Sequence, residues 1–258
     1  MKFFTVTMTA AALALPIGTA HAETLKIMAA DLPPMVNSDG TGREAEVVSS
    51  VMQHCGYDVS FELQPFTRHW ASFDSGEGDA VMTVPTGMPM AGTQSKTYVS
   101  YQNGVSFLAD SGHNIASLAD LNGMKIAAFE GASGILPGLS ETVDSFASYR
   151  EMADQETQSK LLLGKRVDGI LGDGMLFAAY MTNLRDAGAT SGVDANQPVQ
   201  FRAIFEPSNY AMNFRDAEIA AKFDRCFSEL EADGTIAKIN TKWVDKYRDT
   251  LADDYLSM

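Results

Sequence analysis

The stretch that decides the fold runs from residue 24 to residue 84 and reads TLKIMAADLPPMVNSDGTGREAEVVSSVMQHCGYDVSFELQPFTRHWASFDSGEGDAVMTV. Its apolar runs predict three strands, over Thr24–Ala30, Val59–Leu63 and Asp79–Val84. Between them, Arg43–Cys55 carries an apolar stripe at helical spacing that stops at a glycine, and the pattern of Thr67–Phe73 also predicts a helix. Strands that alternate with helices are typical of an α/β fold, in which helices cover a mostly parallel sheet.

A second unit of the same kind follows further along the chain. In it, strands and helices alternate over Lys125–Phe129, Asp154–Leu163, Val167–Leu171 and Met175–Leu184. The pattern is completed by strands at Val199–Phe205 and Tyr210–Phe214 and by a helix at Ala217–Leu230. Two α/β units in series predict two lobes, and we expect the chain to cross between them near Gln102–Gly104 and near Glu206–Asn209.

The N-terminus predicts export. Residues 1–22 begin with Lys2, continue with an apolar run and end in Ala20-His21-Ala22, the small-residue pattern that signal peptidase cleaves. The alternative is a membrane anchor, but the apolar run is too short to cross about 30 Å of hydrocarbon. Position 23 is Glu rather than Cys, so we expect a periplasmic protein without a lipid anchor. In such a chain, Cys55 and Cys226 permit one disulfide, and two buried thiols are the alternative.

The composition excludes several classes of partner and gives no support to enzyme chemistry. The 258 residues include 19 Lys and Arg against 33 Asp and Glu, so the formal net charge is −14. Nucleic acids and anionic membrane surfaces repel such a chain, and we expect neither as a partner. The sequence shows no paired histidine spacing, no nucleotide-binding glycine motif and no nucleophile motif. We therefore expect no metal, no cofactor and no catalytic residue.

Five segments, in this order, resemble the motifs of one protein family. They are Leu25–Pro34, Ser75–Val81, Ser117–Gly131, Gly164–Asp173 and Phe223–Trp243. Together they resemble the periplasmic solute-binding proteins of family 3, which serve amino-acid-type ABC importers, and Pro65–Arg68 is similar to a subgroup with Pro-Trp-x-Arg there. The resemblance implies the type II periplasmic-binding-protein fold: two α/β lobes, each a mostly parallel sheet flanked by helices, joined by two hinge crossings around a ligand cleft.

The family's chain order also implies how this sequence divides. A signal peptide at residues 1–22 would precede lobe one, which takes residues 23–103 plus 210–258, and lobe two would take residues 104–209. Cys55 and Cys226 then fall in the same lobe, which favours the disulfide between them.

The resemblance implies charged ligand-binding residues, some of which are altered here. The family motif places the residue that binds the ligand's amine at Asp173, just after a strand, and a helix N-cap is the alternative role for it. The family's carboxylate-binding Arg has no counterpart between Arg68 and Arg150, and Ser133 stands near the family's lobe-two Thr. Either Arg68 binds a ligand carboxylate or the ligand has none, and a surface salt bridge is the alternative for Arg68.

The remaining candidates are Asp31, Phe66, Trp70, Thr83 and Glu130. Leu32-Pro-Pro-Met35 replaces the family's aromatic platform, so Phe66 and Trp70 become candidates for stacking on the ligand, with core packing as their alternative. Glu130 is either a second negative group facing an amine or part of the solvated surface. Asp31 and Thr83 end strands on the side where open α/β sheets bind ligands.

These features lead to a hypothesis and two alternatives. We expect a monomeric solute-binding protein that captures a small amine-bearing solute, an amino acid or a derivative, and presents it transiently to the membrane-embedded permease of an ABC importer. An exported enzyme on the same scaffold, similar to cyclohexadienyl dehydratase, is the first alternative, with Glu130 or Asp173 as the acid or base. A ligand sensor that reports to a membrane receptor is the second.

Overall fold

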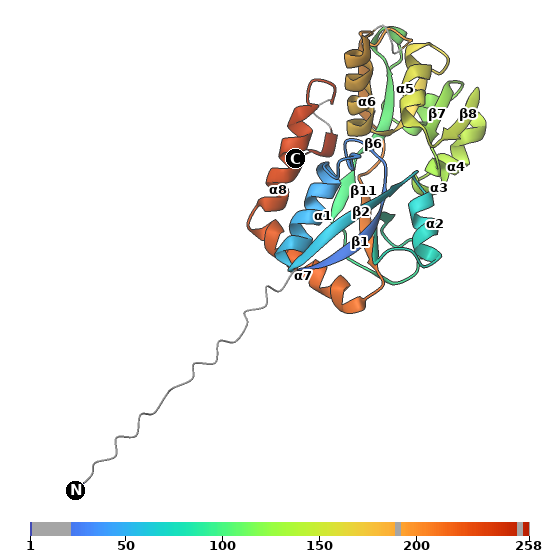
Figure 1. Ribbon diagram of the computed structural model, residues 1–258. Helices are drawn as coiled ribbons and strands as arrows, with labels where there is room; N and C mark the ends of the chain where they lie inside the picture. The colour runs from blue at the N-terminus through green and yellow to red at the C-terminus, as the bar shows by residue number, and fades with distance from the viewer. Residues whose placement is uncertain (2–21, 189–191, 252–254, 258) are drawn as a thin grey trace.

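The computed structural model describes residues 1, 22–188, 192–251 and 255–257. The leader expected at residues 1–22 lies almost wholly outside the described residues. Within those residues, no helix is both long enough and apolar enough to cross a membrane. The chain forms two lobes, each built on its own sheet (Figure 1).

The sheet of lobe one has the strand order β2-β1-β3-β11-β4, and β5 also pairs with β11. Its strands are β1 (Glu23–Ala30), β2 (Tyr57–Gln64), β3 (Ala80–Pro85), β4 (Thr93–Gln94), β5 (Val99–Tyr101) and β11 (Ser208–Phe214). Strand β1 pairs in parallel with β2 and β3, while β11 runs antiparallel to β3. Strands from both ends of the chain therefore form one sheet.

The sheet of lobe two has the order β10-β6-β9-β7-β8. Its strands are β6 (Asn103–Leu108), β7 (Lys125–Phe129), β8 (Ser148–Met152), β9 (Gly169–Asp173) and β10 (Val199–Ala203). Its helices are α3 (Ala132–Ile135), α4 (Leu139–Thr142), α5 (Gln155–Leu163) and α6 (Gly174–Ala187). The strands β8, β7 and β9 are parallel, and β6 and β10 add antiparallel pairs.

The helices of lobe one are α1 (Arg43–His54), α2 (Arg68–Asp74), α7 (Ala217–Ala232) and α8 (Thr235–Lys246). On α1, the side chains of Val47, Val48 and Val51 are fully buried, as the helical spacing of these apolar residues requires. Helix α7 begins where the side chain of Asp216 accepts hydrogen bonds from two backbone N–H groups of the first turn. Figure 1 shows α1, α7 and α8 on one side of the sheet and α2 on the other.

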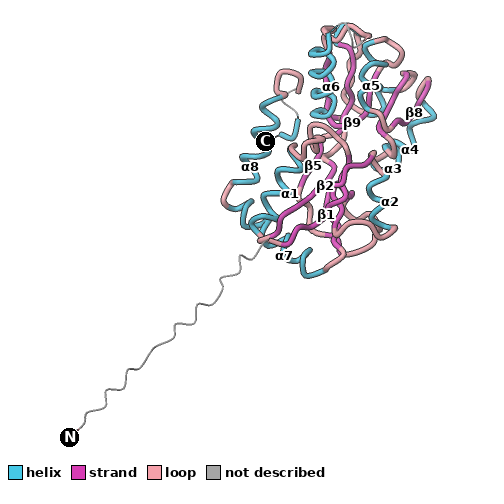
Figure 2. Tube along the Cα trace, viewed as in Figure 1, coloured by secondary structure: helices cyan, strands magenta, loops and turns pink. Residues whose placement is uncertain are grey.

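Short connections join the lobes. Strand β5 ends at Tyr101 in the first sheet, and after Gln102 alone the chain enters β6 of the second sheet. The return crossing lies between Ala203 at the end of β10 and Ser208 at the start of β11. Figure 2 shows the strands in two groups, with β8 and β9 in one and β1, β2 and β5 in the other. Residues close to either crossing therefore border both lobes.

The structure confirms the predicted fold class and the predicted disulfide. The sulfur atoms of Cys55 and Cys226 are bonded, which joins the end of α1 to α7. The predicted strands and helices are present with shifted ends, and the strand expected at Val199–Phe205 stops at Ala203, where the chain leaves the sheet. The sequence reasoning missed the strands β4, β5, β6 and β8 and the helices α3, α4 and α8. Both sheets are mixed rather than wholly parallel, because each contains antiparallel neighbours.

Candidate functional site

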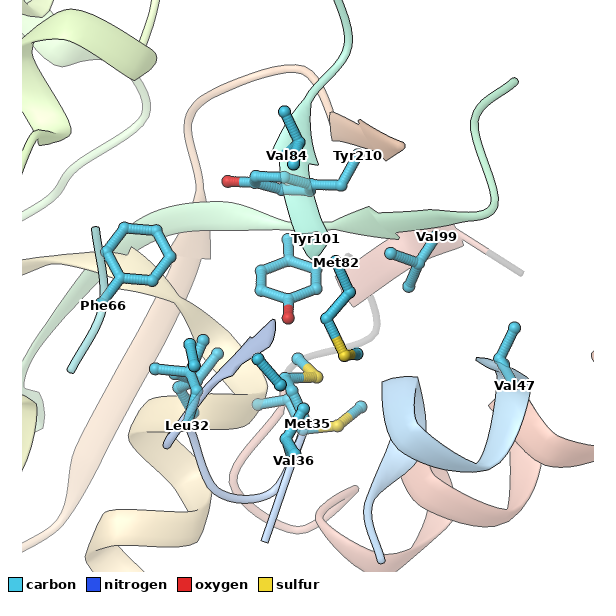
Figure 3. Packing of buried hydrophobic residues seen from close by; sticks show 14 of the residues in the cluster. Leu32, Met35, Val36, Val47, Phe66, Met82, Val84, Val99, Tyr101 and Tyr210 are labelled. Carbon is cyan, nitrogen blue, oxygen red and sulfur yellow. The ribbon is translucent and has the colours of Figure 1, made fainter. Parts of the chain in front are cut away.

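A small cavity lies where the two lobes meet. Its lining comes from lobe one and the hinge (Leu32, Phe66, Tyr101, Asn103, Tyr210) and from lobe two (Phe129, Gln155, Asp173, Leu176). The cavity measures about 20 Å³, which is room for about one water molecule. Figure 3 shows the lobe-one part of this packing, with Phe66 and Leu32 on one side of Tyr101 and Tyr210. In this conformation the lobes are closed on each other.

Aromatic side chains form the contact between the lobes. The rings of Phe66 in lobe one and Phe129 in lobe two meet edge to face, with their centroids 5.9 Å apart. Trp70 packs behind Phe66 at 4.9 Å and does not line the cavity, so the structure gives it the core role that was the alternative. The side chain of Arg68 is exposed and makes no hydrogen bond or ion pair with the described residues. Of these predicted residues, only Phe66 therefore reaches the interlobe cavity.

Asp173 lines the cavity, but its carboxylate is already fully engaged. One oxygen caps α6 by accepting hydrogen bonds from the N–H groups of Met175 and Leu176 at 2.8 and 3.1 Å. The other accepts from the N–H of Gln102 at 2.9 Å and from the Tyr255 hydroxyl at 3.0 Å. Burial raises the pKa of Asp173 to about 6, against the lowering effect of the Arg43 charge and of these donors. The N-cap alternative is thus the observed role, and contact with a ligand amine is a prediction.

The turn after β7 binds a carboxylate that the chain itself supplies. The backbone N–H groups of Gly131 and Ser133 each donate a hydrogen bond of 2.8 Å to the carboxylate of Glu151. The hydroxyl of Tyr149 donates a third, at 2.7 Å. Burial acts to raise the pKa of Glu151, but these hydrogen bonds outweigh it and hold the pKa below its ordinary value. The neighbouring side chain of Glu130 is exposed to solvent.

Acidic residues from both lobes act on Tyr180, which lines a smaller pocket that shares Gln155 and Asp173 with the interlobe cavity. Burial raises the pKa of Tyr180 on α6, and the negative charges of Asp31, Asp154 and Glu156 raise it further. Asp31 follows β1 in lobe one, whereas Asp154 and Glu156 stand at the start of α5 in lobe two. Glu156 is ion-paired with Lys160 at 2.7 Å, and Asp154 accepts hydrogen bonds from Thr157. Three carboxylates against one lysine still leave an excess of negative charge here, which favours a positively charged group between the lobes.

Thr83 belongs to a buried polar cluster rather than to the cavity wall. Its hydroxyl donates a hydrogen bond of 2.8 Å to Glu44, and the hydroxyls of Tyr98 and Tyr101 donate to the same carboxylate. Glu44 is fully buried, and burial raises its pKa although the three hydroxyls act to lower it. The predicted ligand role of Thr83 is therefore not supported by its position, since its side chain already holds Glu44.

The sequence reasoning missed two glutamates that engage candidate site residues, Glu44 at Thr83 and Glu151 at the turn of Gly131 and Ser133. Glu44 stands one turn before the buried Val47 and Val48. Its place on the apolar stripe of α1 therefore indicated that its carboxyl group is buried. Glu151 gave no local signal, because only the pairing of β7 with β8 brings it to the turn. In the described ranges, no cluster of three or more His, Cys, Asp or Glu side chains is arranged to hold a metal ion.

Comparisons with known proteins agree with this architecture. Residues 26–246 match the family model of bacterial extracellular solute-binding proteins, family 3. Among solved structures, an ancestral arginine-binding protein bound to glutamine is 21% identical, with 85% of this chain and 97% of that chain covered and a TM-score of 0.68. No curated protein matches the chain.

Two other solved structures show how widely this fold is used. A histidine kinase sensor domain with similarity to periplasmic binding proteins is 18% identical over 87% of this chain and 97% of that chain, with a TM-score of 0.68. An ancestral amino-acid-binding protein, a precursor of cyclohexadienyl dehydratase, is 19% identical over 85% of this chain and 95% of that chain, with a TM-score of 0.66. At these identities the likeness concerns the fold alone.

Proposed function

The chain belongs to the bacterial extracellular solute-binding proteins of family 3, and we propose that it captures a small amine-bearing solute in the cleft between its lobes. The observations that carry this proposal are the interlobe cavity, which both lobes line, and the negative residues Asp31, Asp154 and Glu156 that act on Tyr180 beside it. A cationic group between the lobes would relieve the repulsion among these carboxylates. The acidic charge of the whole chain, −14, attracts the same class of solute.

The solute does not need a carboxylate. The turn at Gly131 and Ser133 has its N–H groups engaged by Glu151, and the exposed Arg68 does not line the cavity. The aromatic contact of Phe66 with Phe129 offers ring faces and edges that suit an organic cation. An amine, or an amino-acid derivative recognised through its amine, fits these features better than an anion.

Binding requires the lobes to move. A cavity of about 20 Å³ admits about one water, so a solute enters only when the lobes separate about the crossings near Gln102 and near Ala203–Ser208. We assign residues 23–103 plus 210–258 to lobe one and residues 104–209 to lobe two. Contacts of a solute with both lobes would favour closure, and the closed form would be presented to the permease of an ABC importer in the periplasm.

A calorimetric comparison of matched solutes tests the proposal. The chain from Glu23 onward is titrated with agmatine and cadaverine, which lack a carboxylate, and with arginine and lysine, which carry the same side chains with one. We expect the amines to bind at least as tightly as the amino acids. The variant D31N/E156Q is expected to weaken amine binding by about tenfold or more, because it removes a charge from each lobe.

The control carries the same charge change elsewhere. Asp58 and Glu141 are exposed and lie outside the cavity, so D58N/E141Q should leave amine binding unchanged. Equal weakening by the control, or binding of the amino acids alone, would contradict the proposal. Product analysis of the bound amine after incubation separates capture from the enzyme alternative, for which the solute would be converted.

A further inference from the structure

A cavity of ligand size lies behind the hinge, away from the interlobe cleft. It measures about 670 Å³, within the range of about 300–1,000 Å³ typical of small-molecule sites. Both crossings border it, the first through Gln102 and the second through Phe205 and Pro207, and α1, α7 and α8 supply the other walls. The residues that support the proposed amine site, Asp31, Asp154, Glu156 and Tyr180, do not line this cavity.

A buried arginine with an incomplete set of partners lines this cavity. Arg43, the first residue of α1, lines the cavity and is only 2% exposed. Its Nε donates to the side chain of Asn240 and its Nη1 to the carbonyl of Ser100, each at 3.0 Å. Its Nη2 has no partner in the described part of the chain, and no carboxylate described there lies within ion-pair distance of the guanidinium.

A buried guanidinium without a counterion is costly, because two neutral hydrogen-bond partners replace its hydration only in part. The negative charges that act on Arg43 are Glu44 and Asp173. Each of these carboxylates is engaged by other donors, the hydroxyls around Glu44 and the α6 N-terminus around Asp173. A ligand carboxylate at Nη2 would supply the missing charged hydrogen bond.

The other lining residues provide partners for an ammonium group and for an apolar side chain. Glu206 and Glu231 line the same cavity and are exposed, so they stand at its rim with free negative charge. The side chains of Phe205, Phe227 and Ile236 form an apolar surface in the same cavity. One buried cation, rim anions and an apolar wall together match a carboxylate, an ammonium group and an apolar side chain.

We propose that this hinge cavity is a second binding site, which takes a free amino acid with an apolar side chain. The carboxylate binds Arg43, the ammonium group binds the rim at Glu206 and Glu231, and the side chain packs on Phe205 and Phe227. Because the cavity is bordered by both crossings, its ligand contacts the segments that must bend when the lobes open. This site is separate from the interlobe cleft and stands without the function proposed for that cleft.

Calorimetry with leucine and two truncated analogues tests the proposal. The probes are L-leucine, 4-methylpentanoate, which lacks the amine, and 3-methylbutylamine, which lacks the carboxylate, each at millimolar concentration. We expect L-leucine to bind best. The rim variant E206Q/E231Q should weaken the binding of L-leucine by about tenfold or more, because it removes the partners of the ammonium group. The same variant should leave the affinity for 4-methylpentanoate unchanged, since that probe has no ammonium group. The control E218Q changes an exposed charge on the same helix α7, outside the cavity, and should have no effect.

Two further variants decide the location of the ligand. R43M should abolish binding of both carboxylates, and F227W, which adds volume to an apolar wall, should block leucine if R43M does not fold. Absence of leucine binding to the wild type overturns the proposal. So does leucine binding that E206Q/E231Q and F227W leave intact, or that D31N alone abolishes, since the ligand would then lie in the interlobe cleft.

Discussion

The burial of Asp173 makes a prediction about how stability depends on pH. Its pKa is raised from 3.8 to about 6 in the folded protein, because burial disfavours the charged carboxylate more than its donors favour it. The folded state therefore holds this proton more tightly than the unfolded state does. Stability from this group is complete below the unfolded pKa and is lost as the pH rises through the folded value.

The size of the effect follows from the shift. A difference of about two pKa units corresponds to about 3 kcal/mol in total, of which about 2 kcal/mol falls between about pH 4.5 and 7.5. The variant D173N has no carboxyl to titrate, and its amide oxygen can still cap α6. The free energy of unfolding of the wild type, minus that of D173N, should therefore fall by about 2 kcal/mol over this range.

Urea unfolding of both proteins across this pH range measures the difference. Subtracting the free energy of D173N from that of the wild type cancels the contribution of the other carboxylates. The sign is opposite to that of a carboxylate in a salt bridge, whose stabilisation is lost in acid. A difference that is flat, or that rises with pH, would refute the account of Asp173 as a desolvated N-cap. A difference larger than about 3 kcal/mol would mean that a second group titrates with it.

Three other variants test separate parts of the fold by urea unfolding. C55A/C226A should lower the free energy of unfolding by about 5 kcal/mol, since the disulfide spans 171 residues, and a loss below about 1 kcal/mol would contradict the loop-entropy estimate. Glu44→Ala should cost about 3 kcal/mol or more because it leaves three buried hydroxyls without an acceptor, and Glu44→Gln should cost less; equal losses would argue against the cluster. Asp216→Ala should cost about 1 kcal/mol through the lost N-cap of α7, and no change would show that the cap is dispensable.

Local patterns in the sequence were enough to predict the fold class. The run from Thr24 to Ala30 and the apolar stripe of α1 each satisfy a single periodicity, and both elements lie where they were predicted. Helix α8 was missed although Ile236, Trp243 and Val244 stand at helical spacing and are buried. In the sequence, two of these residues belong to the family-like segment Phe223–Trp243, which was interpreted as a motif and not examined for helical spacing.

The candidate site was harder to predict, because it depends on contacts between distant segments. Glu151 reaches the turn at Gly131 through the register of two parallel strands, which no local pattern specifies. Thr83 ends a strand on the expected side, but a glutamate from α1 engages its hydroxyl. Asp173 was predicted from the family motif that the sequence resembles, and its position at the end of a strand explains why it caps α6. A strand end thus places a residue near the cleft without deciding what it binds.

The bond between Cys55 and Cys226 has a practical consequence for anyone who handles this protein. All of lobe two and both crossings lie within the covalent loop that this bond closes. A protease that cuts once anywhere in that loop leaves two fragments joined through sulfur. Such a sample runs as a single species on a non-reducing gel, and only reduction separates the pieces. The integrity of a purified batch is therefore judged on reduced samples.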